Sequence, residues 1–412
     1  VIPGATVTIT NQGTNIVREV TTDSSGRYVV PLLPVGRYTI RVSSSGFAQG
    51  EVTDLVLEVQ DNRTVDFTLS VAAAGQVIEV TGNIVEVDTT TATLGQVIHQ
   101  EQVANLPLNG RNFVQLGHLS PGITKAEGDF LNNQGNTEVS IRGTVSLSAQ
   151  GMRENTNDWL LDGVDNNELT AGAIAILPSV DGIQEFKVLT YNYSAEYGSR
   201  SGATILVITK GGTNEFHGTA FEFFRNDKLD ARNFFDRIPE PAKLRQNQFG
   251  ASLGGPIVKD KAFFFGNYEG TRIRQGLTRL ATVPTDAMCA GNFSGLFNSD
   301  GTPLNIFDPN TTVPRTQFTG NIIPAAFIDP VGQAVCDLYP SPNIAGAVVN
   351  NFSSNPVRTF NDDQFVVRID YKVSENDQIF GRFSYDDADQ FFPLLALASV
   401  PAPVSPKVRR IS

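Results

Sequence analysis

Acidic and amide side chains crowd the stretch Asp158 to Glu168, DWLLDGVDNNE, and oxygen-bearing groups of this kind are the ligands that calcium prefers. An EF-hand loop needs its oxygen ligands at alternate positions, however, and Asp158, Asp162 and Asp165 are not two residues apart. The pair Asp162-Gly163, flanked by apolar residues, is instead typical of a two-residue β-hairpin turn, whose central residues both need positive φ. The sequence predicts a structural turn here and no metal site.

The other residue types that catalyse reactions or hold metals are too widely spaced to act together. The three histidines form neither an HExxH motif nor an i, i+4 pair; they are His99, His118 and His217. In GSRSG, residues 198–202, Arg200 occupies the place of a nucleophilic serine. Because no Walker loop or dinucleotide fingerprint is present either, we expect no enzymatic activity and no cofactor.

The two cysteines, Cys289 and Cys336, lie in a region rich in Pro, Asn and Gly. Neither has the CxxC partner that indicates zinc binding or thioredoxin-like chemistry. In an oxidising compartment we expect a disulfide that closes the intervening loop, and otherwise two ordinary thiols.

Composition limits the class of protein and of partner. With 37 Gly and 22 Pro among short apolar alternations, the 412 residues are expected to form several β-rich modules. The formal net charge of -12, without a cluster of Lys or Arg, argues against nucleic acid as a partner, because a phosphate backbone attracts basic patches. The sequence has no run of about 18 apolar residues, so no membrane-spanning helix is expected.

Residues 1–71 show the period-two alternation of a small antiparallel β-sandwich. The expected strands carry Val7 and Ile9; Tyr28 and Val30; Tyr38, Ile40 and Val42; Leu55, Leu57 and Val59; and Val65, Phe67 and Leu69. Through PGATVTIT, TTDSSGRYVVPLLPVGRYTIRVSSSGF and VDFTLSV, the region resembles the carboxypeptidase regulatory-like (transthyretin-like) domain, which is not catalytic. That family has one more strand before PGATV, so we expect the first strand to be missing and a sheet edge to be open.

Residues 72–83 are a linker of small residues followed by a short extended run, Val77 to Val80. One interpretation is a simple linker strand. The other is a segment that adds itself as a strand to the sheet of a partner, where main-chain hydrogen bonds give affinity.

Residues 84–212 mix short helices with strands. Helical spacing occurs at 103–106 and at 113–119, with a turn at Asn109-Gly110 between them. Six motifs resemble, in order, the plug domain of TonB-dependent outer-membrane receptors of the Oar-like group. They are LPLNGRNF at 106–113, SIRG at 140–143, LLDGVDNN at 160–167, SVDGIQEFKV at 179–188, SAEYGSRSGATILVITKGGTNEFHG at 194–218 and QFGASLGGPI at 248–257.

The resemblance implies an α+β plug domain in which Asp162-Gly163 is the turn of a hairpin. It also implies a TonB box between the amino-terminal domain and the plug. The residues at that place are Gln76, Val77, Ile78, Glu79, Val80, Thr81 and Gly82, with Glu79 interrupting the apolar run.

Residues 213–412 are expected to supply the first strands of an antiparallel transmembrane β-barrel. In DQFVVRIDYKV, Val367 and Ile369 fall on one face and Arg368 and Asp370 on the other, over a length suited to a lipid-facing strand. Strands are expected near 216–225, 246–255, 262–271, 362–373 and 378–387. The short links PIVKDK and SEND would be periplasmic, and the loops 226–245 and 272–361 extracellular.

So few strands cannot close a barrel, and the chain starts at Val1 inside what resembles a domain. We expect it to be a fragment of a longer protein, with the remaining strands beyond Ser412.

The resemblance implies a TonB-dependent receptor or transporter of the bacterial outer membrane. Its partners would be a TonB-type periplasmic energy transducer, outer-membrane lipid, and an unidentified ligand that is a glycan, a peptide or a chelate. The alternative is an outer-membrane-anchored adhesin or surface-assembly protein that binds glycan or protein through its long loops and its sandwich domain.

Overall fold

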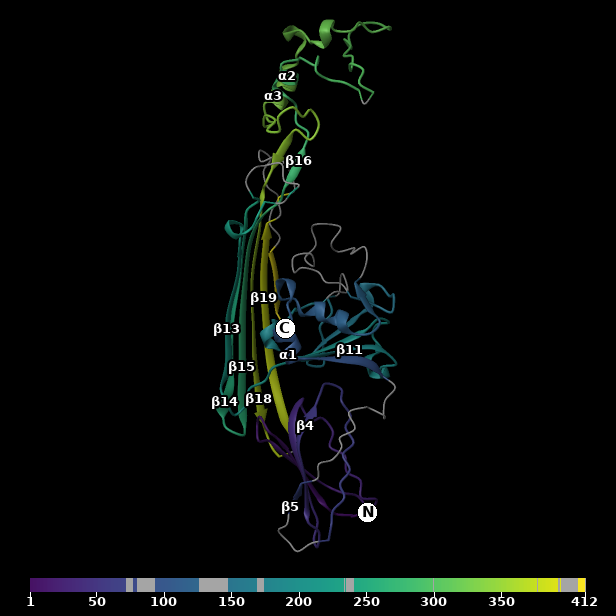
Figure 1. The fold of residues 1–412 in the computed structure, drawn as a ribbon, viewed down its shortest axis with the longest axis vertical. Coiled ribbons are helices and arrows are strands. Elements are labelled where there is room, and N and C mark those ends of the chain that lie inside the picture. The colour runs from purple at the N-terminus through teal and green to yellow at the C-terminus, as the bar shows by residue number, and fades with distance from the viewer. Residues whose placement is uncertain are drawn as a thin grey trace.

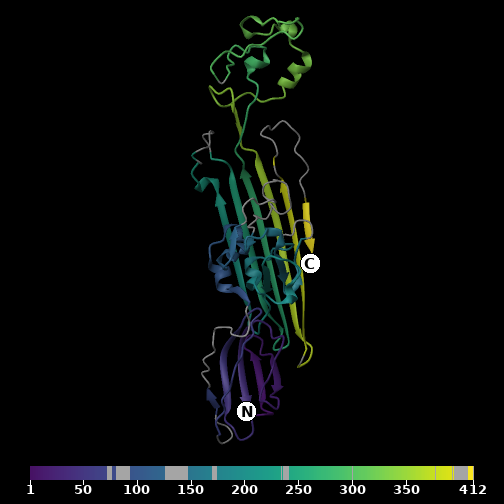
Figure 2. The ribbon, with the colours of Figure 1, turned by 90° about the vertical axis from the view of Figure 1, so that its right-hand side faces the viewer.

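The computed structural model describes residues 1–71, 77–79, 93–125, 147–168, 174–232, 234, 241–298, 300–375, 377–391, 393 and 407–411. The elongated molecule has four parts (Figure 1). The amino-terminal domain lies at one end, and a lobe formed by residues 277–356, the loop lobe, lies at the other (Figures 1 and 2). Between them, a middle domain lies against one face of a long β-sheet (Figure 1). Among the described residues, no helix is long and apolar enough to cross a membrane.

The amino-terminal domain is built on one mixed sheet. Its strands are β1 (Thr6–Asn11), β2 (Val17–Thr21), β3 (Gly36–Ser43), β4 (Gln49–Leu57) and β5 (Val77–Glu79), in the order β2-β1-β3-β4-β5. Alternate side chains such as Val7, Ile9 and Ile40 are buried on one face of the sheet, as the period of two requires.

Two runs expected as strands, around Tyr28 and around Phe67, are not strands in the structure, although their side chains pack against this core. Near Tyr28, Pro31 and Pro34 lack the N–H that a ladder needs. The two runs are linked by a side chain instead, because the Tyr28 hydroxyl donates to the Val65 carbonyl at 2.8 Å.

The middle domain has a five-stranded sheet in the order β10-β9-β12-β11-β6. These strands are β6 (Leu94–His99), β9 (Asp158–Leu161), β10 (Val164–Asp165), β11 (Ile183–Tyr191) and β12 (Thr204–Thr209). Smaller elements surround it: α1 (Gln100–Asn105), η1 (Asn109–Arg111), η2 (Phe113–Leu119), β7 (Ile123–Lys125), β8 (Leu147–Ala149), η4 (Glu154–Thr156), η5 (Val180–Gly182) and η6 (Ala195–Tyr197). Phe113 packs edge-on against Phe186 at 5.3 Å between ring centroids in the core. SIRG, at 140–143, lies outside the described residues.

The two helices expected in this domain are shorter or tighter than the spacing predicted. Helix α1 ends at Asn105, and Leu106 is extended because the following Pro107 disfavours the helical conformation before it. The second, η2, is a 3-10 helix that begins with the Asn112 side chain accepting a hydrogen bond from the Val114 N–H.

The long sheet consists of antiparallel strands that are neighbours in sequence order. They are β13 (His217–Asn226), β14 (Leu244–Val258), β15 (Ala262–Gly276), β18 (Val357–Lys372), β19 (Gln378–Phe391) and β20 (Lys407–Ile411). Strands β14 and β15 have 15 residues each and β18 has 16, so they are longer than the alternation predicted. Polar cross-strand pairs extend them: the Arg272 guanidinium binds the Asp363 carboxylate at 2.7 Å, and Arg274 donates to the Asn361 amide oxygen.

The two faces of the long sheet differ in chemistry. Val367, Ile369 and Phe383 are 43, 48 and 45% exposed on the face that points away from the middle domain. Arg368 and Asp370, on the same strand as Val367, lie on the other face and contact each other at 2.9 Å. The sequence-based assignment of an apolar and a polar face agrees with this arrangement.

The loop lobe connects β15 to β18 at the end of the sheet remote from the amino-terminal domain (Figure 1). It contains β16 (Arg279–Ala281), α2 (Asp286–Cys289), η8 (Thr319–Asn321), η9 (Ala325–Phe327), α3 (Pro330–Cys336) and β17 (Phe352–Ser354). The links at the opposite end of the sheet are short, at residues 259–261 and 373–377.

Candidate functional site

The hairpin turn at Asp162-Gly163 joins β9 to β10, with Leu161 opposite Val164. The φ angles are 49° at Asp162 and 82° at Gly163, both positive as a type I′ turn requires. An added Cβ on Gly163 would meet nothing within 4 Å, so backbone conformation, and not crowding, favours glycine there.

The Asp162 side chain does more than shape the turn. One of its oxygens accepts from the Thr209 N–H at 2.8 Å, which fixes the carboxylate at the end of β12. The same carboxylate binds two cations of the long sheet, Arg382 at 2.9 Å and Arg368 at 3.4 Å. Arg368 also donates to the Asp370 carboxylate and to the Thr209 carbonyl. A single acidic side chain of the middle domain is therefore shared by two arginines of the sheet.

A second charged contact between the middle domain and the long sheet involves Arg111, inside the LPLNGRNF motif. Its guanidinium binds Asp181 of η5 and lies 3.5 Å from the Glu269 carboxylate of β15. Ser179 donates to the same Glu269. The guanidinium also lies 3.9 Å from the centroid of the Phe221 ring on β13.

Burial determines what these ion pairs do. Side-chain exposure is 4% for Asp162, 13% for Arg368 and 10% for Arg382. Charges so far from water are costly unless paired, and losing one partner of a buried pair costs about 3–5 kcal/mol. The two contacts hold the middle domain in one orientation against the polar face of the sheet. The sequence marked Asp162 only as a turn residue, because the arginines that bind it lie more than 200 positions further on.

The amino-terminal domain docks on the middle domain through the residues that follow β4. The Val59 N–H donates to the Glu185 carboxylate of β11, and Lys187 donates to the carbonyls of Val59 and Gln60 at 3.2 Å each. Val59 is buried in an apolar cluster with Leu189 and other residues of the middle domain. The expectation that Val59 continues a strand is thus wrong, since β4 ends at Leu57.

Glu185 is the titratable group of this contact. Burial raises its pKa to about 7, against the hydrogen bond from Val59, which lowers it. Glu58 and Asp61 also raise the pKa, and Lys187 lowers it.

The amino-terminal domain also touches the short turn between β14 and β15. The Asn15 side chain donates to Asp260 at 3.1 Å, and the Asn214 N–H donates to the Gly13 carbonyl at 2.9 Å. The domain is therefore held by the middle domain and by the sheet together.

The segment expected to bind a partner is described only at Val77–Glu79. These residues form β5, which pairs in parallel with the start of β4, Gln49 opposite Val77 and Glu51 opposite Glu79. Gln76, Val80, Thr81 and Gly82 lie outside the described residues.

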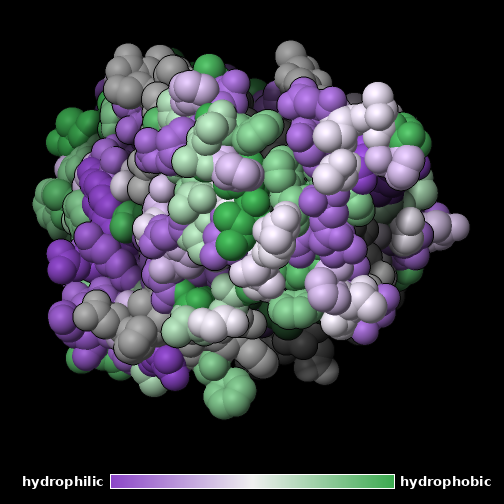
Figure 3. All heavy atoms as spheres, turned by 90° about the horizontal axis from the view of Figure 1, so that it is seen from above, coloured by the Kyte–Doolittle hydropathy of each residue, from purple (hydrophilic) through white to green (hydrophobic). Residues whose placement is uncertain are grey.

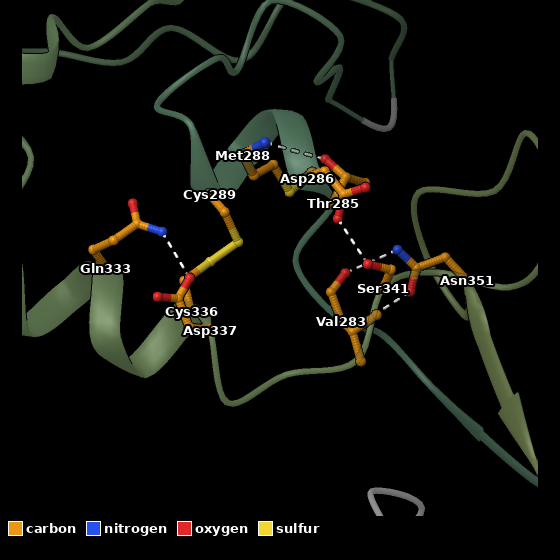
Figure 4. Close-up of a disulfide and its surroundings, with 10 residues drawn as sticks. All are labelled: Val283, Thr285, Asp286, Met288, Cys289, Gln333, Cys336, Asp337, Ser341 and Asn351. Carbon is orange, nitrogen blue, oxygen red and sulfur yellow. Dashed lines mark hydrogen bonds between the residues drawn. A yellow bond between two sulfur atoms is a disulfide. The ribbon is translucent and has the colours of Figure 1, made fainter. Parts of the chain in front are cut away.

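In the loop lobe, Cys289 at the end of α2 and Cys336 at the end of α3 form a disulfide with their Cα atoms 5.9 Å apart (Figure 4). Hydrogen bonds join other parts of the lobe near it: Ser341 donates to Asp286 at 3.0 Å, and the Asn351 side chain binds the backbone of Val283. The cysteines thus link two short helices that are distant in the sequence.

No group of three or more His, Cys, Asp or Glu side chains is placed to hold a metal ion within the described part of the chain. The features described above are contacts between the parts of the molecule. Buried ion pairs join the middle domain to the long sheet, the buried Glu185 joins it to the amino-terminal domain, and β5 lies at the edge of the amino-terminal sheet.

In sequence, the chain matches two protein-family models and a curated relative. Residues 208–404 match the outer membrane beta barrel domain, and residues 1–70 match the carboxypeptidase regulatory-like domain. The TonB-dependent transporter Oar of Myxococcus xanthus is 30% identical over 293 residues, which are 67% of this chain. The chain spans 26% of the length of that relative.

Solved structures give weaker matches. The outer membrane transporter YddB of Escherichia coli is 11% identical with a TM-score of 0.42, over 73% of this chain and 33% of that one. The ferric enterobactin receptor PfeA of Pseudomonas aeruginosa is 13% identical with a TM-score of 0.38, over 72% of this chain and 33% of that one.

Proposed function

Because this chain belongs to the TonB-dependent receptors of the bacterial outer membrane, in the Oar-like group, we propose that it takes up a ligand with force transmitted by a TonB-type transducer. The family consists of transporters and receptors, so the chain is not an enzyme. In this proposal the middle domain is the plug, the long sheet is part of the barrel wall, and its exposed apolar face contacts lipid.

The observation that supports the proposal most directly is the ion-paired contact between the middle domain and the polar face of the long sheet. A plug must be held firmly at rest and still be released by force. The carboxylate of Asp162, shared by Arg368 and Arg382, suits both needs. Buried ion pairs define one orientation, and they are short-range contacts that a small displacement breaks.

The transducer would grip the segment from Gln76 to Gly82 by strand addition, since it stands between the amino-terminal domain and the plug. Energy derived from the proton gradient would then be applied as a pull on that segment. Under this pull the plug would open locally at its least stable parts, because these unfold first.

Calorimetric titration of a peptide spanning residues 74–84 against the periplasmic domain of the host's TonB-type protein tests this. Replacing Ile78 by Pro removes a backbone N–H and should abolish strand addition. The matched control is Ile78→Ala, which shortens the side chain and keeps the N–H, and it should still bind. If the parent peptide does not bind, the proposal of energy coupling through this segment is wrong.

The loop lobe favours a second candidate, an anchored adhesin. It carries its own disulfide and exposes large apolar side chains, among them Phe297 at 62% and Val331 at 71%. From the lobe's end of the molecule, apolar and polar residues are interspersed over the surface (Figure 3). Attachment of cells to a glycan- or protein-coated surface that persists in the Ile78→Pro variant, without uptake of the bound glycan or protein by the wild type, would support adhesion.

A further inference from the structure

Strand β5 occupies the edge of the amino-terminal sheet, and β4 is its neighbour. The described strands place no other chain segment on the outer side of β5. Successive residues of a strand direct their N–H and C=O groups to opposite sides. Pairing with β4 uses the N–H and C=O groups on one side of Val77–Glu79, and the groups on the other side point away from β4.

The position of this edge is fixed relative to the rest of the molecule. Strand β4 runs from its pairing with β5, at Gln49 to Glu51, to its end at Leu57, and two residues later Val59 is held by Glu185 of the middle domain. The strand that carries β5 is thus the strand that leads directly into the docking contact. The amino-terminal domain therefore holds β5 at a defined place, at the end of this domain that is remote from the middle domain (Figure 1).

The pairing of β5 with β4 is short. It covers three residues, with Gln49 opposite Val77, Gly50 opposite Ile78 and Glu51 opposite Glu79. A pairing of this length has few main-chain hydrogen bonds, and the net strength of each is modest. The contact is therefore suited to align the segment while allowing it to be detached.

We propose that the amino-terminal sheet presents Val77–Glu79 as a preformed strand, and that an extended strand of the periplasmic transducer adds to the open edge of β5. The inference rests on the proposed function and says how the segment is offered to its partner. A segment already extended on β4 loses less conformational freedom on binding than a flexible one, so presentation strengthens association. The amino-terminal domain would then be the docking platform of the receptor.

A crosslink between β4 and β5 tests presentation in the full-length receptor. Neighbouring strands are about 4.8 Å apart, within the Cα separation of about 4.4–6.8 Å that a disulfide needs. The double variant Glu51→Cys, Glu79→Cys should form a disulfide, visible as a change in gel mobility on reduction. Transducer binding is measured for the oxidised and the reduced form of this one variant, with wild type in both conditions as the control for the native disulfide.

We expect the locked form to bind the transducer's periplasmic domain at least as tightly as the reduced form. A loss of more than about tenfold on locking would mean that β4 hides the segment, and would overturn the proposal. Failure of the crosslink to form would overturn it as well. If neither form binds, and the peptide of residues 74–84 does not bind either, the proposed function itself has failed and the inference falls with it.

Discussion

Replacing Asp162 by Asn removes one negative charge from the contact between the middle domain and the long sheet and leaves the hairpin turn in place. Asn accepts positive φ readily, and Asn-Gly is itself a favoured type I′ pair. The amide oxygen can still accept the 2.8 Å hydrogen bond from the Thr209 N–H. The Thr209 hydroxyl donates at 2.7 Å to the other carboxylate oxygen, which becomes an amide NH2 in the variant. The effect of the change therefore reports the ion pairs with Arg368 and Arg382 together with that hydrogen bond.

The magnitude follows from burial. Removing one partner of a buried ion pair costs about 3–5 kcal/mol, and we expect the lower value, about 3 kcal/mol, because Arg368 keeps its contact with Asp370 at 2.9 Å. Each 1.4 kcal/mol is a factor of ten, so receptors with the Asp162 hairpin displaced should become on the order of 100-fold more frequent.

Hydrogen–deuterium exchange of the full-length receptor in detergent measures this population. Amides of β9, β10 and β12 should exchange faster by up to the same factor, while those of the amino-terminal domain should not change. The control is Asp165→Asn, in the same hairpin, because Asp165 is exposed and its side chain accepts hydrogen bonds from Asn167 within the middle domain. If these amides exchange no faster in the Asp162 variant than in this control, the ion pairs do not hold the hairpin against the long sheet, and the prediction is refuted.

Two further predictions concern the other contacts. The pKa of Glu185 is about 7 in the folded protein, against 4.5 ordinarily, so its protonated form favours folding. Its contribution to the free energy of unfolding should be fully present below about pH 4.5 and be lost as the pH rises through about 7. Thermal unfolding between pH 4 and pH 8 should show this, and Glu185→Gln should remove that part of the dependence; an unchanged profile would contradict it. Replacing both Cys289 and Cys336 by Ser opens a loop with a sequence separation of 47 and should destabilise the loop lobe by about 4 kcal/mol. Proteolysis of intact cells should then cut the lobe faster and spare the long sheet, and equal resistance would argue against a stabilising role.

The prediction of a mainly β protein from an outer-membrane receptor family is confirmed by the sheets and by the relatives. These features could be predicted from local patterns, because the alternation of apolar and polar residues along a strand such as β18 can be recognised from consecutive residues alone. Val367 and Arg368 could be assigned to opposite faces without knowing any other strand. The length of the strands was underestimated, since beyond the apolar band they are held by cross-strand polar pairs such as that of Arg272 and Asp363.

The contacts between domains could not be predicted, because each joins residues without a common local pattern. Arg368 looked like any polar residue on a half-apolar strand, and only the fold brings it to Asp162. Val59 looked like the last apolar residue of a strand, yet it turns away to meet Glu185. The parallel pairing of β5 with β4 joins positions that are far apart in the sequence, such as Gln49 and Val77, and no turn motif specifies it.

The charges around Asp162 are divided unequally between the middle domain and the long sheet. The carboxylate belongs to the middle domain, and both arginines belong to the sheet. Withdrawal of the hairpin would uncover two guanidinium groups, of which that of Arg368 keeps the Asp370 carboxylate at 2.9 Å. Without the hairpin, this place on the sheet would hold two guanidinium groups and one carboxylate, and so a local excess of one positive charge, which the return of the Asp162 carboxylate neutralises.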